Sequence, residues 1–305
     1  MTSLIAFAAL VLVPNQDALK GHTREIWSVA VSPDGTTIAS GSTDLTVKLW
    51  SSSSKTCTGT IEGFDGAVLS LAFSPDGKFL AAGEMYKKIR IFDTGTKALL
   101  RTIEDIEGAV TGLAFSPDGK TVYASCRDNL LRAWAVSPAS ESGAVKGQAN
   151  YEVNGVSVSK DGKSVATVEG NGGVRIWGIQ PLAPRKTMKH GDDKASSVVF
   201  SPDGTLLATG GGDNPVHLWD VASGAAVSGF QSPKIDANAL AFSPDGGTLV
   251  VGTQDNFVMV LDSKSGAVKM KKESHERPVT SVAVSPDGKW FVTGSQDYTL
   301  RIWKL

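Results

Sequence analysis

Large apolar and small residues alternate in a short segment that recurs along the whole chain, for example in Ser70-Leu71-Ala72-Phe73. Successive side chains of a β-strand point to opposite faces, so this period of two residues predicts a strand. One face of each strand is large and apolar, whereas the small residues of the other face allow close stacking on a neighbouring sheet. The equivalent segments are 28–31, 70–73, 112–115, 155–158, 197–200, 239–242 and 281–284.

A Ser-Pro-Asp-Gly turn directly follows each of these strands, although one copy has Lys160 in place of the proline. The turn glycines are 42 or 43 residues apart. A period of about 40 residues that fills a chain indicates a repeat architecture, in which each unit buries its apolar face on its neighbours. The copies lie at 32–35, 74–77, 116–119, 159–162, 201–204, 243–246 and 285–288.

Two further strands and a looser fourth segment follow each turn. The third strand ends fifteen residues after the turn glycine, on Trp50, Phe92, Trp134, Trp177, Trp219, Leu261 and Trp303. Four short strands per repeat without a helical period indicate an all-β fold, and four-stranded sheets repeated around an axis form a β-propeller. We therefore expect a single domain over residues 1–305, a seven-bladed propeller of four-stranded antiparallel blades.

The seventh repeat reaches Leu305 directly after its third strand, so an N-terminal strand is expected to complete this blade and close the ring. The repeat register places that strand over 14–19, whereas the strand-like apolar run is 4–13, and both assignments remain open. The run 4–13 is too short to span a bilayer, and it lacks the basic residues and cleavage site of a signal peptide. We expect no membrane span and an intracellular protein, in the cytoplasm or the nucleus.

Charge and cysteine content narrow the classes of ligand. The formal net charge of -1 gives no chain-wide basic field, so direct binding of nucleic acid is not expected. Cys57 and Cys126 lie in different repeats and cannot form a disulfide framework, which favours a reducing compartment. The four histidines show no metal-ligand spacing, so neither a metal ion nor a cofactor is expected.

Third strands that end in tryptophan, the dipeptide Trp219-Asp220, and Gly21-His22 about twenty residues before an aspartate turn resemble the WD40 repeat family. The resemblance covers essentially the whole chain. It implies a seven-bladed propeller, monomeric by itself, that serves as a non-catalytic adaptor for other proteins within a multisubunit complex. The stretch Ile26–Ala30 and the chain length are also similar to the small WD40 subunit of the superkiller RNA-decay complex.

The resemblance further implies buried tetrads of His, Ser or Thr, Asp and Trp. Blades one and seven match in full, and blades two and six depart most. Blade five has Thr209, Asp213 and Trp219, but its His190 is one residue out of register. The complete sets are His22, Ser40, Asp44 and Trp50, and His275, Thr293, Asp297 and Trp303.

Partners of this family usually bind the rim formed by the starts of the first strands and by the turns between second and third strands. Trp27 is the leading candidate, because its register holds no other aromatic residue and Trp is a frequent interface anchor. The alternative is that Trp27 only fills the channel mouth. The candidate partner-binding residues are Glu25, Trp27, Met85, Tyr86, Arg127, Gln254, Gln296 and Tyr298.

Two other classes of function remain as alternatives to a protein-binding scaffold. A basic register could form a girdle for RNA or phosphoinositides, although we expect its charges to be structural; it comprises Lys48, Arg90, Arg132, Arg175 and Arg301. A propeller enzyme is least favoured. His22, Ser40 and Asp44 have the residue types of a hydrolase triad, but the set recurs in blade seven and no Gly-x-Ser-x-Gly elbow is present.

Overall fold

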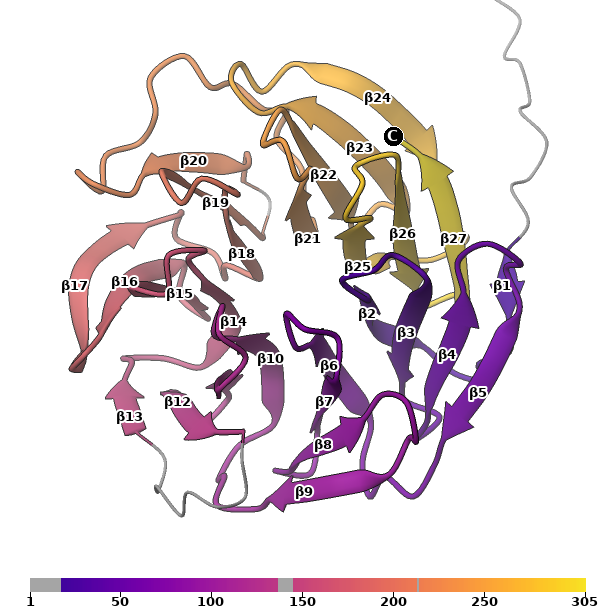
Figure 1. The fold of residues 1–305 in the computed structure, drawn as a ribbon. Helices are drawn as coiled ribbons and strands as arrows, with labels where there is room; N and C mark the ends of the chain where they lie inside the picture. The colour runs from indigo at the N-terminus through magenta and orange to yellow at the C-terminus, as the bar shows by residue number, and fades with distance from the viewer. Residues whose placement is uncertain (1–17, 137–144, 213) are drawn as a thin grey trace, which may run out of the picture.

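Seven antiparallel β-sheets are arranged radially around a central axis (Figure 1). The computed structural model describes residues 18–136, 145–212 and 214–305, and these ranges contain 27 strands. Six sheets have four strands and one has three. This arrangement confirms the seven-bladed propeller predicted from the repeats. Within the same ranges no helix has the length and apolar character needed to cross a membrane.

Each blade runs from an inner strand at the channel to an outer strand at the edge of the ring (Figure 1). Blade one consists of β2 (Ile26–Val31), β3 (Thr37–Ser42), β4 (Val47–Ser51) and β5 (Cys57–Ile61). Blade two consists of β6 (Val68–Phe73), β7 (Phe79–Glu84), β8 (Ile89–Asp93) and β9 (Leu99–Ile103). Blade three consists of β10 (Val110–Phe115), β11 (Thr121–Cys126), β12 (Leu130–Ala135) and β13 (Val145–Gln148). Blade four consists of β14 (Val153–Val158), β15 (Ser164–Glu169), β16 (Gly173–Ile179) and β17 (Leu182–Lys189). Blade five consists of β18 (Ser197–Phe200), β19 (Leu206–Gly210) and β20 (His217–Asp220). Blade six consists of β21 (Ala237–Phe242), β22 (Thr248–Thr253), β23 (Phe257–Asp262) and β24 (Val268–Glu273).

Blade seven combines both ends of the described chain. Its first three strands from the channel outward are β25 (Val279–Val284), β26 (Trp290–Ser295) and β27 (Thr299–Lys304), and its outer strand is the N-terminal β1 (Leu19–Lys20). Leu19 pairs with Leu300 and is almost fully buried. The expected closing strand is therefore present, and the rest of its candidate region, at 4–13 and 14–17, lies outside the described residues.

Blade five differs from its neighbours at its outer edge. Where a fourth strand was expected, the described chain forms isolated bridges that pair Trp219 with Ala226 and Pro215 with Lys234. Gly229 has a φ of 87°, and Pro233 lacks an amide donor. Both features interrupt the extended, hydrogen-bonded backbone that an outer strand needs.

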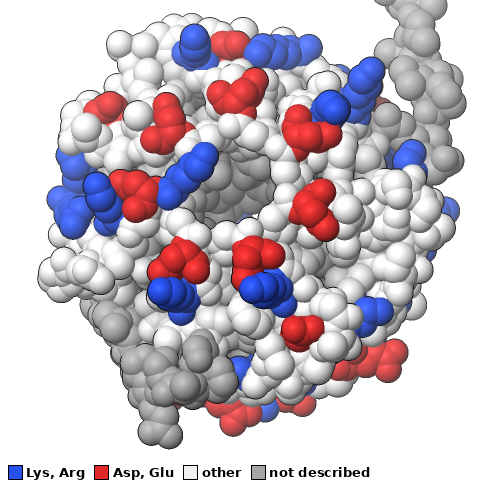
Figure 2. Space-filling view, in the orientation of Figure 1, with Lys and Arg blue, Asp and Glu red and all other residues white. Residues whose placement is uncertain are grey.

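The Ser-Pro-Asp-Gly turns form a ring on one face of the propeller. In every copy the serine hydroxyl donates to the aspartate at 2.5–2.7 Å. The proline of each turn lies against the glycine of the next blade; a Cβ built on Gly77, for example, would lie 3.6 Å from Cδ of Pro33. Gly204, which follows the copy with Lys160, has no such neighbour within 4 Å. Acidic side chains surround the channel opening on the face shown in Figure 2.

The hydrophobic core lies between the blades. One cluster joins Leu49 and Ile61 of blade one to Val68 and Leu80 of blade two. The second strands carry small residues that allow this close approach, and a Cβ built on Gly41 would lie 2.6 Å from the Val68 side chain. Each blade is therefore held mainly by its two neighbours, as the repeat pattern implied.

Candidate functional site

The starts of the inner strands and the turns between second and third strands share one rim of the ring. Backbone hydrogen bonds join the two sets: the Thr43 amide donates to the Glu25 carbonyl at 3.0 Å, and the Met85 amide to the Ala67 carbonyl at 2.8 Å. The same bond recurs in other blades, from Arg127 to Ala109, from Gln254 to Asp236 and from Gln296 to Pro278. The structure thus places all the predicted partner-binding residues on this rim.

Six inner strands carry a β-bulge at their second residue, and in four blades this residue bridges to the next blade. A bulge re-aims a side chain out of the regular alternation. In those four blades it directs a polar side chain to a backbone carbonyl one blade further along. The bonds run from Thr111 to Val153 (2.6 Å), Asn154 to Ala195 (3.0 Å), Asn238 to Val279 (3.1 Å) and Thr280 to Ile26 (2.5 Å).

Trp27 occupies this bulge position in β2 and does not make the bridging bond. Its side chain is 39% exposed, and its indole has no hydrogen bond to any described residue. Four of the eight exposed large apolar side chains in the described chain lie on this rim of blades one and two. We call these four, Trp27, Leu45, Met85 and Tyr86, the blade one–two patch.

Leu45 stands in a backbone conformation that disfavours its side chain. Its φ is 65°, in the left-handed region, and the equivalent residues Asn129 and Asn256 have φ values of 65° and 67°. Asparagine tolerates this conformation better than a bulky apolar residue does. Tyr298 takes the same position in blade seven, with a φ of 71°, and the Arg277 guanidinium lies 5.8 Å from its ring centroid.

The other predicted rim residues have partners within the propeller or lie in more distant blades. A carboxylate oxygen of Glu25 accepts a hydrogen bond from the Thr43 hydroxyl at 2.7 Å, which holds the pKa of Glu25 below its usual value. Gln254 of blade six accepts from Asn238 at 3.0 Å, and Arg127 is exposed on blade three. The apolar candidates are therefore gathered on blades one and two, whereas the polar ones are spread around the ring.

Two buried tetrads flank the ring closure. In blade one, His22 Nδ1 lies 2.7 Å from Asp44 Oδ2 and His22 Nε2 lies 2.7 Å from Ser40 Oγ, which also accepts from Trp50 Nε1 at 2.8 Å. Burial alone would raise the pKa of Asp44, but hydrogen bonds from His22, Thr46 and the Thr23 amide hold it well below its usual range. Blade seven repeats the arrangement with His275, Thr293, Asp297 and Trp303 at 2.7–2.9 Å.

Blade five builds a related network despite its displaced histidine. Thr209 Oγ1 accepts from Trp219 Nε1 at 2.9 Å and lies 2.9 Å from His190 Nδ1. His217 Nδ1 approaches His190 Nδ1 to 3.0 Å. Burial and the neighbouring His217 lower the pKa of His190 to about 4. The remaining candidate of this blade, Asp213, lies outside the described residues.

In blades two to four the basic register serves ion pairs within the blades. Arg90 Nε lies 2.8 Å from Glu84 Oε1, and Arg132 makes a bidentate pair with Asp128 at 2.6 and 2.7 Å. In blade four, Arg175 pairs with Glu169 in the same way as Arg90 with Glu84. The expected structural role of these arginines is therefore visible, but sequence reasoning missed their partners. A carboxylate six residues before the arginine was the available signal for Glu84 and Glu169.

The geometry disfavours chemistry at the groups with reactive side chains. Ser40 has an exposed fraction of 0%, so its hydroxyl cannot reach a substrate. Burial raises the pKa of the Cys126 thiol to about 12, which leaves it protonated at neutral pH. Among the residues that the structure describes, no three His, Cys, Asp or Glu side chains are grouped to hold a metal ion.

Comparison with known proteins identifies the repeat. No curated protein matches the chain. The family model for "WD domain, G-beta repeat" matches seven consecutive segments that together span most of the sequence, and each segment ends at or beside the end of a third strand. The segments are 14–51, 55–93, 97–135, 141–178, 183–220, 227–262 and 267–304. The chain therefore belongs to the WD40 family.

Proposed function

We propose that this protein is a non-catalytic scaffold, a subunit of a larger assembly, that binds a partner protein through the blade one–two patch. WD40 propellers typically bind other proteins, and this chain carries seven such repeats. Trp27 is the central anchor in this proposal, with Leu45, Met85 and Tyr86 beside it. Glu25, Arg127, Gln254, Gln296 and Tyr298 contribute the polar surroundings of the contact.

The observation that carries the proposal is the exposed aromatic side chain at the bulge of β2. Among the described strands, the only other bulge without a bridging bond, in β6, carries Leu69, which is half-buried. Four other blades use this position for a hydrogen bond to the next blade, so Trp27 replaces a residue that could stabilise the ring. A side chain that is 39% exposed contributes less to the core than a buried one, and Leu45 adds an unfavourable backbone conformation. Aromatic anchors next to apolar neighbours are typical of protein interfaces.

The propeller itself supplies the variants that test the proposal. Trp27→Thr introduces threonine, which stands at the equivalent positions 111 and 280. Leu45→Asn introduces asparagine, which stands at the equivalent positions 129 and 256. Both changes suit the local backbone, so the melting temperature is expected to hold or rise. Leu100→Thr, which removes an exposed leucine from the outer strand β9, is the matched control.

The measurement is affinity purification of the tagged protein from native extract, with quantitative mass spectrometry. Proteins that bind the patch are expected to be retained by the wild type and by Leu100→Thr, and to be lost from the Trp27→Thr/Leu45→Asn variant. Retention of the same proteins by that double variant, with an intact fold, contradicts the proposal.

A further inference from the structure

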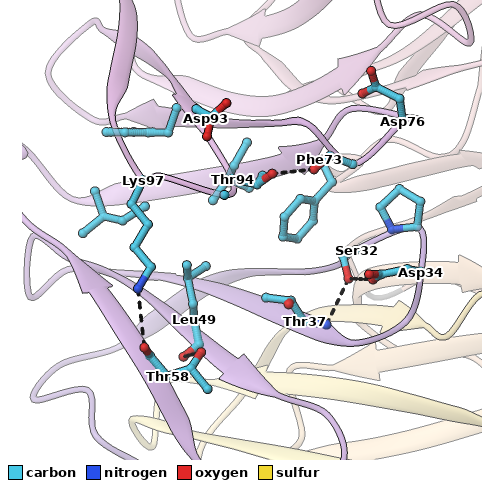
Figure 3. Close-up of a pocket in the computed structure, with 16 residues that line it drawn as sticks. Ser32, Asp34, Thr37, Leu49, Thr58, Phe73, Asp76, Asp93, Thr94 and Lys97 are labelled. Carbon is cyan, nitrogen blue, oxygen red and sulfur yellow. Dashed lines mark hydrogen bonds between the residues drawn. The ribbon is translucent and has the colours of Figure 1, made fainter.

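A cavity of about 530 Å³ opens between blades one and two on the face of the Ser-Pro-Asp-Gly turns. This face is opposite to the rim that carries the blade one–two patch. The volume of the cavity lies within the range of roughly 300–1,000 Å³ that is usual for ligand sites. We call it the blade one–two cavity (Figure 3).

Two positions of blade one beside the cavity hold small residues. The first residue of its second strand is Thr37. Blades three, four and six also have a small residue at this register (Thr121, Ser164 and Thr248), whereas blades two, five and seven have Phe79, Leu206 and Trp290. Each of these larger side chains packs against the core cluster at its own blade boundary. Thr37 leaves the corresponding space unfilled.

The second small residue is Gly59 of the outer strand β5. It pairs with Leu49, and the equivalent residues in blades two, four and six are Arg101, Lys186 and Met270. Arg101 and Lys186 both reach a carbonyl of the next blade and so close the gap there. At Gly59, instead, Lys97 crosses from blade two and donates to the Thr58 carbonyl at 3.4 Å (Figure 3).

The interior of the cavity is apolar and its mouth is acidic. Leu49 and Phe73 point into the space from the two blades (Figure 3), and Ile61, Leu80 and Phe92 complete the apolar lining. Asp34, Asp76 and Asp93 also line it, against the single ammonium of Lys97. An apolar ligand group with a neighbouring positive charge would match both parts, whereas an acidic ligand would be repelled.

The three carboxylates are held in place and charged. The Ser32 hydroxyl, the Ser74 hydroxyl and the Thr96 amide keep the pKa values of Asp34, Asp76 and Asp93, respectively, below their usual values. In Asp76 and Asp93 it is the Oδ1 atom that accepts these hydrogen bonds. The Oδ2 atom of Asp76 lies 3.5 Å from the exposed ammonium of Lys78, a surface pair that a bound cation can replace.

We propose that the blade one–two cavity binds an extended peptide segment of a partner protein in which a Leu or Phe side chain is flanked by Lys or Arg. The apolar side chain enters between Leu49 and Phe73. The basic residue lies at the mouth, beside Asp34 and Asp76. This second site is independent of the proposed function of the opposite rim.

A random heptapeptide library displayed on phage tests the proposal directly. Selection uses the wild-type protein, and counter-selection uses Thr37→Phe, which adds the side chain that blade two carries at this register. Thr37→Val is the matched control because it keeps the size and β-branching of threonine and leaves the cavity open. Gly59→Arg, the residue of blade two at the other small position, is a second way to fill the cavity.

The expected result is a set of peptides that bind the wild type and Thr37→Val and share an apolar residue next to Lys or Arg. For a synthetic peptide of this set, fluorescence anisotropy should show affinity lowered about tenfold or more by Thr37→Phe and by Gly59→Arg. Asp34→Asn/Asp76→Asn should also weaken binding and reduce its dependence on salt.

Three outcomes overturn the proposal: no peptide selected over Thr37→Phe, selected peptides that lack a basic residue, or equal affinity for the filled variants. Circular dichroism and melting temperature establish that each variant is folded. Partners of the blade one–two patch should be retained by Thr37→Phe, so a failure of this proposal can be told apart from a failure of the proposed function.

Discussion

The hydroxyl groups of Ser40 and Thr293 are the junctions of the two tetrads. Each lies in hydrogen-bond contact with a histidine and a tryptophan, and each belongs to a side chain that is fully buried. A buried polar network specifies its arrangement when every member is satisfied and is costly when one partner is lost. At the scale of single residues, therefore, the aspartates that complete these networks should matter for stability.

Asp44→Ala is expected to lower the free energy of unfolding by about 1–3 kcal/mol, because it leaves the buried His22 and the half-buried Thr46 without their hydrogen-bond partner. Asp255→Ala is the matched control, since Asp255 is the exposed aspartate at the corresponding turn of blade six. Chemical denaturation of both variants measures the difference. Equal changes for Asp44→Ala and Asp255→Ala would contradict a structural role for the tetrad.

His190 makes stability depend on pH. Its pKa is lowered to about 4 in the folded protein, whereas an unfolded histidine titrates at about 6.5. Between these values the unfolded chain binds a proton that the native chain does not, so the free energy of unfolding falls as the pH decreases. His190→Asn is expected to weaken this dependence, measured as the change in urea midpoint between about pH 7 and pH 4.5.

His217 and His275, whose pKa values are also lowered by burial, should leave part of the pH dependence in the His190→Asn variant. The comparison concerns the slope with pH and not the stability at one pH, because removing His190 also removes its hydrogen bond to Thr209. A variant with the slope of the wild type would exclude His190 as a source of the dependence.

The turn after each inner strand is the repeated element that joins neighbouring blades. Proline packs on the glycine of the next turn at six of the seven blade boundaries, and the exception is the boundary after Lys160. Since the serine, aspartate and glycine of that turn keep the geometry of the other copies, its backbone already accepts a proline. Lys160 is therefore a local gap in an otherwise continuous ring.

Lys160→Pro is expected to stabilise the protein by about 0.4–1 kcal/mol, because proline restricts the unfolded chain at a position whose folded backbone suits it. It should also supply the contact that Gly204 lacks. Thermal and urea denaturation measure the gain, and Pro33→Lys is the reverse control, for which a loss is expected. A destabilised Lys160→Pro variant would show that the turn of blade four differs from the others.

The strands, the blade number and the tetrads could be predicted from the sequence because each prediction rested on spacing that recurs in several copies. Features that depend on one blade alone could not be predicted in this way. The pairing of Arg90 with Glu84 requires two side chains of adjacent strands to meet, and the exposure of Trp27 depends on a bulge. The reduced outer edge of blade five and the Gly59 position near the cavity are likewise departures from the repeat.

At the scale of the whole molecule, the two faces of the ring differ although the blades are similar. One face carries the apolar patch of blades one and two, and the other carries the Ser-Pro-Asp-Gly turns and the blade one–two cavity. Both proposed sites lie at the same pair of blades. A partner with two separate segments could therefore contact both faces near one edge of the ring, which would join two weak contacts into a stronger one.

The pairing of β1 with β27 sets an order of events during synthesis. Leu19 is synthesised first, and its partner Leu300 follows about 280 residues later. At roughly 5–20 residues per second, this interval is about 15–60 s. During that time Leu19 has no native partner, so blade seven cannot take up its outer strand until residue 300 has been made.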